Sequence, residues 1–359
     1  MAYTDIDDAS EHFQVATYNS NSGYAVSVVN DGNSDLKPDL LWVKSRETAS
    51  GYDYNHNLID SSRGRSKTLY IDTTAAEMTA SQTNYDLASF DTDGFTNGAP
   101  EYTNSLGGHT VGKVAWQWKA NAGTTASNSD GNITSTVQAN TEAGFSIVTW
   151  TGNETSSATV GHGLNQKPET IFYKRRNNGT YNWTAHLLQL GLVGSNTYVG
   201  YPNLANSWEQ TTIAEPTSTV IKPGSGAPQN SGDMLAYCWH GVKGYSKFGS
   251  YYGNSSVDGP VVYTGFKPAL VIIKGNVANH WIMYDNKRPG YNGVAYELYC
   301  NLNHPEYTGA SYFDIDLLSN GFKLKLSDGS INSSGNRYAY MAWAESPFIS
   351  STGTPTTAR

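Results

Sequence analysis

The chain contains one short stretch three times: Lys37-Pro38-Asp39-Leu-Leu-Trp-Val-Lys44, Lys167-Pro168-Glu169-Thr-Ile-Phe-Tyr-Lys174 and Lys267-Pro268-Ala269-Leu-Val-Ile-Ile-Lys274. In each copy a lysine precedes the proline, an apolar run follows, and a second lysine stands six positions after the proline. Internal repetition of this kind is the sequence signature of an architecture built from copies of one unit. We therefore predict three copies of one module of roughly 100 residues, the size of a small domain.

The segments around the repeated stretch recur as well. A phenylalanine opens a strand-like stretch at the start of each module: Phe13, Phe145 and Phe248. An aromatic run closes each module, and its last residue is a tryptophan: Trp118, Trp239 and Trp343. We predict these three tryptophans to be hydrophobic-core residues, and we take them as landmarks of the repeat together with Pro38, Pro168 and Pro268.

These landmarks predict a division of the chain. The expected parts are an acidic N-terminal arm, module 1, a polar linker, module 2, module 3 and a polar C-terminal tail: 1–12, 13–120, 121–143, 144–243, 244–349 and 350–359.

The composition and the short alternating runs predict an all-β fold. The 25 Tyr, 9 Trp and 36 Gly, with only 15% charged residues, favour strands and tight turns over helices. Phe322-Lys-Leu-Lys-Leu326 alternates as a half-buried strand does, and Asp91-Thr-Asp-Gly-Phe95 and Ser319-Asn-Gly-Phe322 read as turns. Module 2 has Val220-Ile-Lys-Pro-Gly224 at that place, which predicts an altered hairpin. We expect three tandem antiparallel β-sandwich modules, jelly-roll-like, with one short helix over 72–78.

Charge and hydropathy exclude several classes of function. The net charge of -8 and the pI near 5.4 argue against nucleic-acid binding, which needs clustered Lys and Arg. No stretch approaches the ~20 apolar residues that cross a bilayer, so we expect no membrane insertion. The N-terminus is acidic and lacks an apolar signal region, which predicts synthesis in a cytoplasm. Cys238 and Cys300 are too few for a disulfide framework.

The sequence carries no motif that predicts catalysis. The eight histidines stand singly, so we predict no metal site and no cofactor. Asp91-Thr-Asp93-Gly94 lacks the further oxygen ligands of a calcium loop and reads as a turn. Nucleophile elbows and phosphate-binding loops are also missing from the sequence. We expect a protein that is not an enzyme, although two carboxylates from distant parts of the chain remain compatible with a hydrolase.

Aromatic residues in the expected loops are the candidate binding residues. Rings flanked by Asn, Gly and Ser combine flat apolar faces with hydrogen-bonding groups, which suits a sugar or a protein partner. The alternative is that these rings fill gaps between modules or subunits. The candidates are Tyr52, Tyr54, Tyr181, Trp183, Trp208, Tyr291 and Tyr296.

Several longer phrases resemble a family of repeat-built virion proteins from tailed phages of marine bacteria, of the cyanophage and pelagiphage type. They include His56-Asn-Leu-Ile-Asp-Ser-Ser-Arg-Gly64, Gly144-Phe-Ser-Ile-Val-Thr-Trp-Thr-Gly-Asn153, Lys247-Phe-Gly-Ser-Tyr251 and Phe313-Asp-Ile-Asp-Leu-Leu-Ser-Asn-Gly-Phe322. The likeness covers nearly the whole chain. It implies a structural component of a virus particle and supplies no catalytic residues. Module 2 departs from the pattern where Leu190-Gly191 replaces the Arg-Gly turn.

Together these observations predict a non-enzymatic virion protein. The first hypothesis is a tail-fibre or receptor-binding component that adheres to host surface glycan or protein, with other virion proteins as partners. By analogy with phage fibres we expect a homo-oligomer, with a trimer favoured. The second hypothesis is a capsid decoration or head-fibre protein, and the third is a polysaccharide depolymerase.

Overall fold

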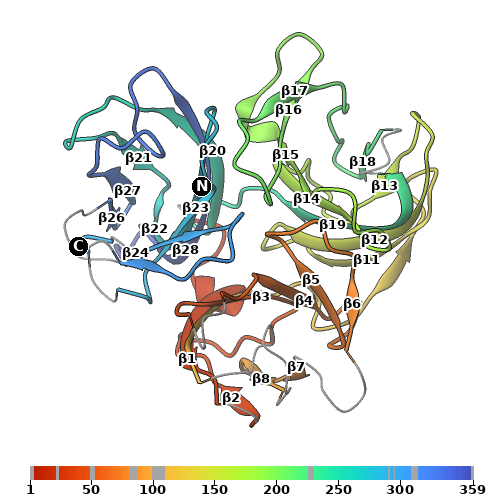
Figure 1. Ribbon diagram of the computed structural model, residues 1–359, viewed down its shortest axis with the longest axis horizontal. Coiled ribbons are helices and arrows are strands. Elements are labelled where there is room, and N and C mark those ends of the chain that lie inside the picture. The colour runs from red at the N-terminus through yellow and green to blue at the C-terminus, as the bar shows by residue number, and fades with distance from the viewer. Residues whose placement is uncertain are drawn as a thin grey trace.

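The computed structural model describes residues 4–21, 24–48, 53–80, 87–98, 110–224, 230–289, 292–294, 296–308 and 314–356. It is an all-β structure of antiparallel sheets, in which the only helices over these ranges are the 3-10 turns η1 (Ala9–Glu11) and η2 (Leu188–Leu190). None of the described helices is long and apolar enough to cross a membrane. The views show three lobes around a common centre (Figure 1).

Module 1 forms a six-stranded sheet in the order β1-β9-β3-β4-β5-β6 and a three-stranded sheet in the order β2-β8-β7. Its strands are β1 (Phe13–Asn19), β2 (Val26–Val28), β3 (Leu40–Ser45), β4 (Asn57–Asp60), β5 (Lys67–Tyr70), β6 (Met78–Thr79), β7 (Leu87–Phe90), β8 (Phe95–Asn97) and β9 (Gly112–Trp118).

Module 2 forms an eight-stranded sheet in the order β10-β11-β12-β19-β14-β15-β16-β17 and a two-stranded sheet of β13 and β18. Its strands are β10 (Ala126–Asn128), β11 (Ser135–Asn140), β12 (Phe145–Asn153), β13 (Val160–Gly161), β14 (Thr170–Arg175), β15 (Thr184–Leu187), β16 (Thr197–Gly200), β17 (Glu209–Thr211), β18 (Val220–Ile221) and β19 (Ser231–Trp239).

Module 3 forms a six-stranded sheet in the order β20-β28-β22-β23-β24-β25 and a three-stranded sheet in the order β21-β27-β26. Its strands are β20 (Ser246–Tyr252), β21 (Val261–Tyr263), β22 (Phe266–Gly275), β23 (Ile282–Asp285), β24 (Tyr296–Tyr299), β25 (Tyr307–Thr308), β26 (Ile315–Leu318), β27 (Gly321–Leu324) and β28 (Arg337–Pro347).

The three large sheets share one topology, as the repeat predicts. In each module the strand that holds the module's first phenylalanine (β1, β12 or β20) pairs with the closing strand, and the closing strand pairs with the strand of the repeated stretch (β3, β14 or β22). The register is conserved at the closing tryptophan, which lies opposite the module's first phenylalanine in modules 1 and 2, as Phe13 lies opposite Trp118. Trp118 also lies opposite Leu40 on the other side, as Trp343 lies opposite Leu270.

Each large sheet is buried on both faces. One face packs against the small sheet of its own module, as Leu41, Val43 and Ala115 pack with Phe95 in module 1. The alternate residues, which include Trp42, belong to a core shared by all three modules. Because successive strand residues point to opposite faces, the central strands carry apolar residues at nearly every position.

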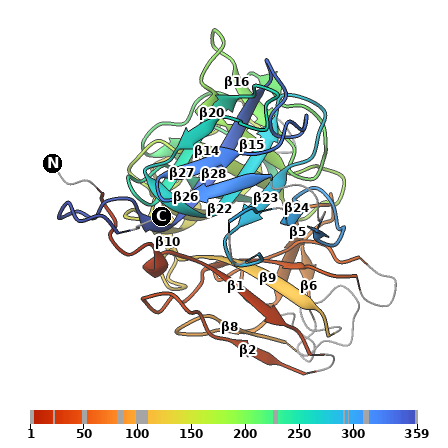
Figure 2. The same cartoon turned by 90° about the vertical axis from the view of Figure 1, so that its left-hand side faces the viewer.

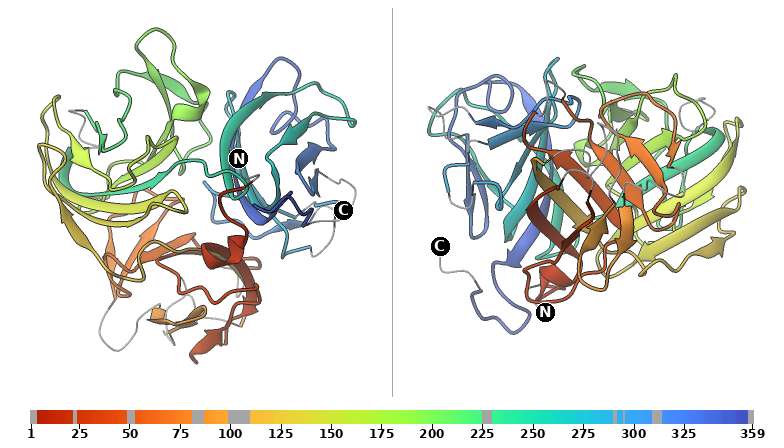
Figure 3. Two further views of the ribbon diagram at one scale, coloured as in Figure 1. Left: turned by 180° about the vertical axis from the view of Figure 1, so that it is seen from behind. Right: turned by 60° about the horizontal axis from the view of Figure 1, so that its bottom comes forward.

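The three closing tryptophans meet where the large sheets face one another. Their ring centroids are 5.2 Å apart for Trp118 and Trp343, 6.0 Å for Trp239 and Trp343, and 6.3 Å for Trp118 and Trp239. All three side chains are buried, as predicted. The modules therefore do not form a string; they close into a ring with approximate threefold symmetry (Figures 1 and 3).

A buried lysine from each module forms a hydrogen bond to a neighbouring module. These are the second lysines of the repeated stretch, and each ammonium donates to a backbone carbonyl of a neighbouring module. Lys44 donates to Asn303 O at 2.9 Å, Lys174 to Thr74 O at 2.7 Å and Lys274 to Ala205 O at 3.2 Å. Module 1 thus binds module 3, module 3 binds module 2, and module 2 binds module 1.

An aromatic side chain repeats the same link at each seam between modules. The indole N–H groups of Trp183 and Trp281 donate to Tyr70 O and Tyr201 O, at 2.8 and 3.0 Å. At the equivalent position of module 1, His56 Nε2 lies 3.0 Å from Tyr299 O. Burial places the pKa of His56 well below its usual value, which favours the neutral ring.

Charged networks close two of the three seams. Arg63 binds Asp60 and Glu77 of its own module, and Arg176 of module 2 reaches the same Glu77. Module 3 repeats this arrangement. Arg288 binds Asp285 and Glu306 of its own module, and Arg46 of module 1 reaches the same Glu306. At the third seam the register places Leu187 of module 2 where Asp60 and Asp285 stand, so this seam is apolar there.

Two predictions about local structure are wrong. The expected linker 121–143 contains β10 and β11, which extend the large sheet of module 2 through pairing with β12. Residues 72–78 form a turn and extended chain because Asp72 accepts from the His56 N–H and Glu77 is drawn into the arginine network. The N-terminal arm, over its described residues, packs at the centre of the ring, where Thr4 donates to Lys243 O (Figure 3).

The C-terminal tail lies beside this arm. Ser351 donates its N–H to the Asp7 carboxylate at 2.6 Å, and Ile349 forms a bridge with Pro355. The two segments project on the same side of the molecule (Figure 2).

The predicted hairpins of modules 1 and 3 are confirmed. β7 and β8 flank the Asp91 turn, and β26 and β27 flank the Ser319 turn. The glycine at each turn is required by close approach, because a Cβ on Gly94 or Gly321 would lie 2.0 Å from a backbone carbonyl oxygen of the adjacent strand. In module 2 this hairpin is absent from the described residues, and the two-stranded sheet of β13 and β18 takes its place, as the altered sequence predicts.

Replacing one axial tryptophan is expected to destabilise all three modules together. Trp239→Ala removes a ring that contacts both other tryptophans, and large-to-small substitutions of this kind cost about 3–5 kcal/mol of unfolding free energy. Denaturant unfolding followed by fluorescence and by circular dichroism measures the change. The exposed Tyr252→Ala is the control. Separate transitions for separate modules would contradict a shared core.

The buried lysines are expected to make stability rise with pH in the alkaline range. Desolvation lowers the pKa of Lys44 to about 8, from an unfolded value near 10.5. Between these values the unfolded chain binds more protons than the folded one, so this group's contribution to stability increases with pH. From pH 7.5 to 9.5 the unfolding free energy of wild type is expected to gain about 1–2 kcal/mol relative to Lys44→Met.

Urea unfolding at both pH values measures this difference. The matched control is Lys243→Met, the same substitution at an exposed lysine. The difference in unfolding free energy between wild type and Lys44→Met is expected to grow with pH. If this difference stays constant or shrinks, Lys44 is not the titrating group.

Candidate functional site

The structure changes the interpretation of two candidate aromatics. Trp183 is fully buried and donates to the neighbouring module, and Tyr54 is 1% exposed with the Lys113 ammonium 4.8 Å from its ring centroid. Their prediction as exposed binding residues is therefore wrong, because both side chains are buried. Tyr52 and Tyr291 lie outside the described residues.

The other three candidates are half-buried and come from different parts of the chain. Tyr181 follows β14, with the Arg175 guanidinium 5.2 Å from its ring centroid. Trp208 precedes β17 and packs against the shared core, and Tyr296 opens β24. None of them lines either of the two hollows described below.

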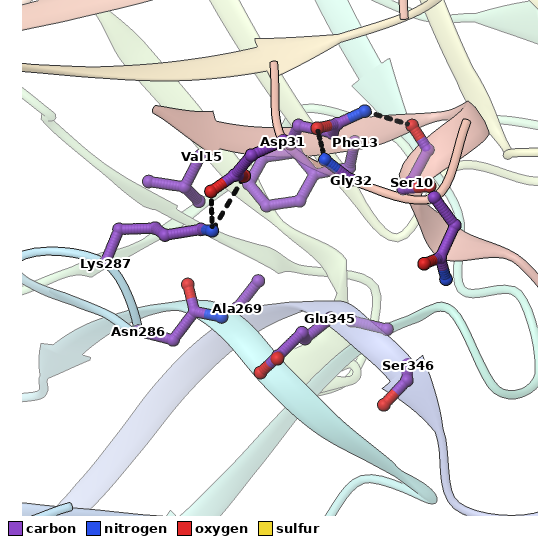
Figure 4. Close-up of a pocket in the computed structure, with 13 residues that line it drawn as sticks. Ser10, Phe13, Val15, Asp31, Gly32, Ala269, Asn286, Lys287, Glu345 and Ser346 are labelled. Carbon is purple, nitrogen blue, oxygen red and sulfur yellow. Dashed lines mark hydrogen bonds and ion pairs between the residues drawn. The ribbon is translucent and has the colours of Figure 1, made fainter. Parts of the chain in front are cut away.

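The candidate site is a cavity at the seam between modules 1 and 3, with a volume of about 220 Å³ (Figure 4). Its floor is apolar and consists of Phe13, Val15, Ala269 and Ala344, all at most 5% exposed. Its rim is polar and consists of Ser10, Gln14, Asp31, Gly32, Asn33, Asn286, Lys287, Glu345 and Ser346.

One of the lining residues marks a difference within the repeat. The residue after the repeated proline is Asp39 in module 1 and Glu169 in module 2, but Ala269 in module 3. Asp39 is fully buried and accepts from Ala120 N, Ala122 N, Gly123 N, Ser61 and Gln138 at 2.6–2.8 Å.

Glu169 likewise accepts from Gly241 N at 2.5 Å. The methyl side chain of Ala269 cannot make such bonds, and Ala269 lines the cavity in module 3.

The rim is held in place by interactions across the seam. Lys287 of module 3 lies 2.7 Å from both carboxylate oxygens of Asp31 in module 1. Gln14 holds the loop that carries Asp31, because its amide donates to Ser10 O and Ser34 O and accepts from Gly32 N. The polar groups of the rim are therefore positioned before any ligand arrives.

Two rim residues retain capacity to accept hydrogen bonds. Asn286 Oδ1 is buried and has no partner within the described part of the chain. Asn286 Oδ1 has almost no solvent-accessible surface, so a ligand reaches this acceptor only when the side-chain amide turns toward the cavity. Glu345 binds Lys267 at 2.7 Å and, as a carboxylate with two oxygens, can accept further bonds.

A second, more open hollow lies on module 2. It is lined mainly by hydroxyl groups from β10, β11 and β12, beside Arg176: Ser127, Thr134, Ser135, Thr136, Thr149, Trp150, Thr151 and Arg176. Arg176 is already bound to Glu77.

One buried carboxyl pair escaped prediction from the sequence. Tyr284 donates to Glu297 at 2.8 Å and lies 3.4 Å from Asp314, while Tyr299 donates to Glu297 at 2.5 Å. Burial and the neighbouring Glu297 raise the pKa of Asp314 to about 8. The pair lines neither hollow. No group of three or more His, Cys, Asp or Glu suited to a metal occurs among the residues that the structure describes.

Comparison with known proteins gives one family. No curated protein and no solved structure shows significant similarity to the chain. One family model matches residues 8–347 as a single unit, which spans all three modules of the ring. The chain therefore belongs to the family described as Domain of unknown function (DUF7483).

Proposed function

We propose that the protein is a non-enzymatic component of a tailed-phage particle, a tail-fibre or receptor-binding protein that adheres to the host cell surface. The observation that carries this proposal is the cavity between modules 1 and 3, which joins an apolar floor to a pre-positioned polar rim. Small-molecule sites have this combination, in which apolar walls supply contact and a few polar groups fix orientation.

The closed ring supports the proposal. Its three modules share one core and are linked through buried hydrogen bonds at every seam, so the rim of the cavity belongs to a stiff body. A stiff site binds with little ordering cost. Several weak sites on one particle raise the overall affinity by roughly 10²–10⁴ when they engage together.

A homotrimer is part of the proposal by analogy with phage fibres. One chain already has approximate threefold symmetry, so assembly does not need three chains to create it. Light scattering of the purified chain measures the number of copies.

Binding to intact host cells tests the proposed function. Fluorescently labelled protein is mixed with cells of the bacterium that the phage infects and with the same cells stripped of surface polysaccharide. We expect saturable binding to intact cells and at least tenfold less binding to stripped cells. The released polysaccharide is expected to compete, and reducing ends are measured in the same samples.

Two outcomes would contradict the proposal. Absence of binding to either cell type, with a folded protein, would favour a capsid decoration or head-fibre role. Release of reducing ends above that of a heat-unfolded control would favour a depolymerase.

A further inference from the structure

We infer that the cavity between modules 1 and 3 binds one uncharged sugar ring, and that Ala269 is the residue that makes room for it. This inference rests on the proposed function and names the ligand class for its site. The charges, the hydrogen-bonding groups, the floor and the size of the cavity support this inference.

The charges of the lining disfavour an anionic ligand. Asp31 and Glu345 are carboxylates, and Lys287 is the single cationic side chain among the lining residues. Both oxygens of Asp31 engage the Lys287 ammonium at 2.7 Å, so an acidic sugar would compete with Asp31 for this cation. A phosphate, sulfate or uronate ring would therefore meet a lining with a net negative charge.

The hydrogen-bonding groups favour a ligand rich in hydroxyl donors. Asn286, Glu345 and Ser346 line the cavity, and the Glu345 carboxylate can accept hydrogen bonds beyond the one from Lys267. Figure 4 shows the Asn286 amide beneath the Asp31–Lys287 pair and beside Ala269. Sugar hydroxyls both donate and accept, so they satisfy such acceptors and can also bind Ser346.

The floor and the size fit one ring. Phe13, Val15, Ala269 and Ala344 present carbon atoms, which match the C–H faces of a pyranose. The cavity of about 220 Å³ is smaller than the roughly 300–1,000 Å³ of drug-sized sites, so it holds a terminal sugar and not a long chain segment.

The other two modules show how the site can be closed. Asp39 and Glu169 occupy the position of Ala269 and bind backbone N–H groups from the end of the closing strand. Ala269→Asp therefore places a carboxylate where the other two modules hold Asp39 and Glu169, and this carboxylate is expected to occupy the space of the sugar.

Ligand-observed saturation-transfer NMR on the full chain tests the inference. The probes are the methyl glycosides of glucose, galactose, mannose and N-acetylglucosamine, with glucuronate as the anionic probe. We expect saturation transfer to at least one neutral glycoside and none to glucuronate. Ala269→Asp is expected to weaken binding at least tenfold, whereas Ala126→Asp, the same change at an exposed residue of β10, leaves it unchanged.

Asn286→Ala provides a second variant in case Ala269→Asp does not fold. It removes a side-chain amide that lines the cavity and is expected to weaken binding of the same glycoside roughly three- to tenfold, the effect of one hydrogen bond. Stronger binding of glucuronate, or full binding by a folded Ala269→Asp, would overturn the inference.

The two proposals fail in different ways. Absence of transfer to every neutral glycoside, with polysaccharide-dependent cell binding intact, would overturn the sugar site and leave the adhesion function standing. If the protein binds a glycoside, Ala269→Asp removes this binding and no cell binding occurs, the sugar site stands and the adhesion function is overturned.

Discussion

The meeting of three tryptophans at the centre of the ring is the constraint on which the rest of the structure depends. Trp118, Trp239 and Trp343 come from the same position of three sheets and lie within 5.2–6.3 Å of one another by ring centroid. Each large sheet must therefore turn one face to the other two sheets and the opposite face to its own small sheet. A module by itself would expose the first of these faces to water. The ring exists because three such faces cover one another, which removes a large apolar area from solvent.

Two of the three seams hold a matched pair of polar groups. Tyr237 donates to Asp60 across the seam of modules 1 and 2, and Trp116 donates to Asp285 across the seam of modules 1 and 3. At the third seam the equivalent positions are Met341 and Leu187, so donor and acceptor are both replaced by apolar residues. This pattern follows the cost of burial, because removal of one partner alone would leave a buried polar atom unpaired.

Much of the fold could be predicted from the sequence, since repetition shows equivalent positions without any structure. The strands that follow Pro38, Pro168 and Pro268, the closing tryptophans and the Gly94 and Gly321 turns are local patterns with one structural solution. The ring could not be predicted, because alternation shows that both faces of a strand are apolar but not what covers the second face. For the same reason Trp183 was interpreted as an exposed ring: nothing local shows that its indole N–H reaches Tyr70 O of another module.

The candidate site was visible in the sequence only as a difference between repeats. Lys-Pro-Asp39 and Lys-Pro-Glu169 set a pattern that Lys-Pro-Ala269 breaks, yet the consequence depends on what the carboxylate does in the other modules. Asp39 accepts five hydrogen bonds at a seam where β11 contributes Gln138, and module 3 has neither that carboxylate nor an added strand beside it. Function in a repeat protein is therefore to be sought where one copy lacks a residue that the others need for structure. At such a position the fold already supplies rigid walls, and loss of one side chain is enough to open a site between them.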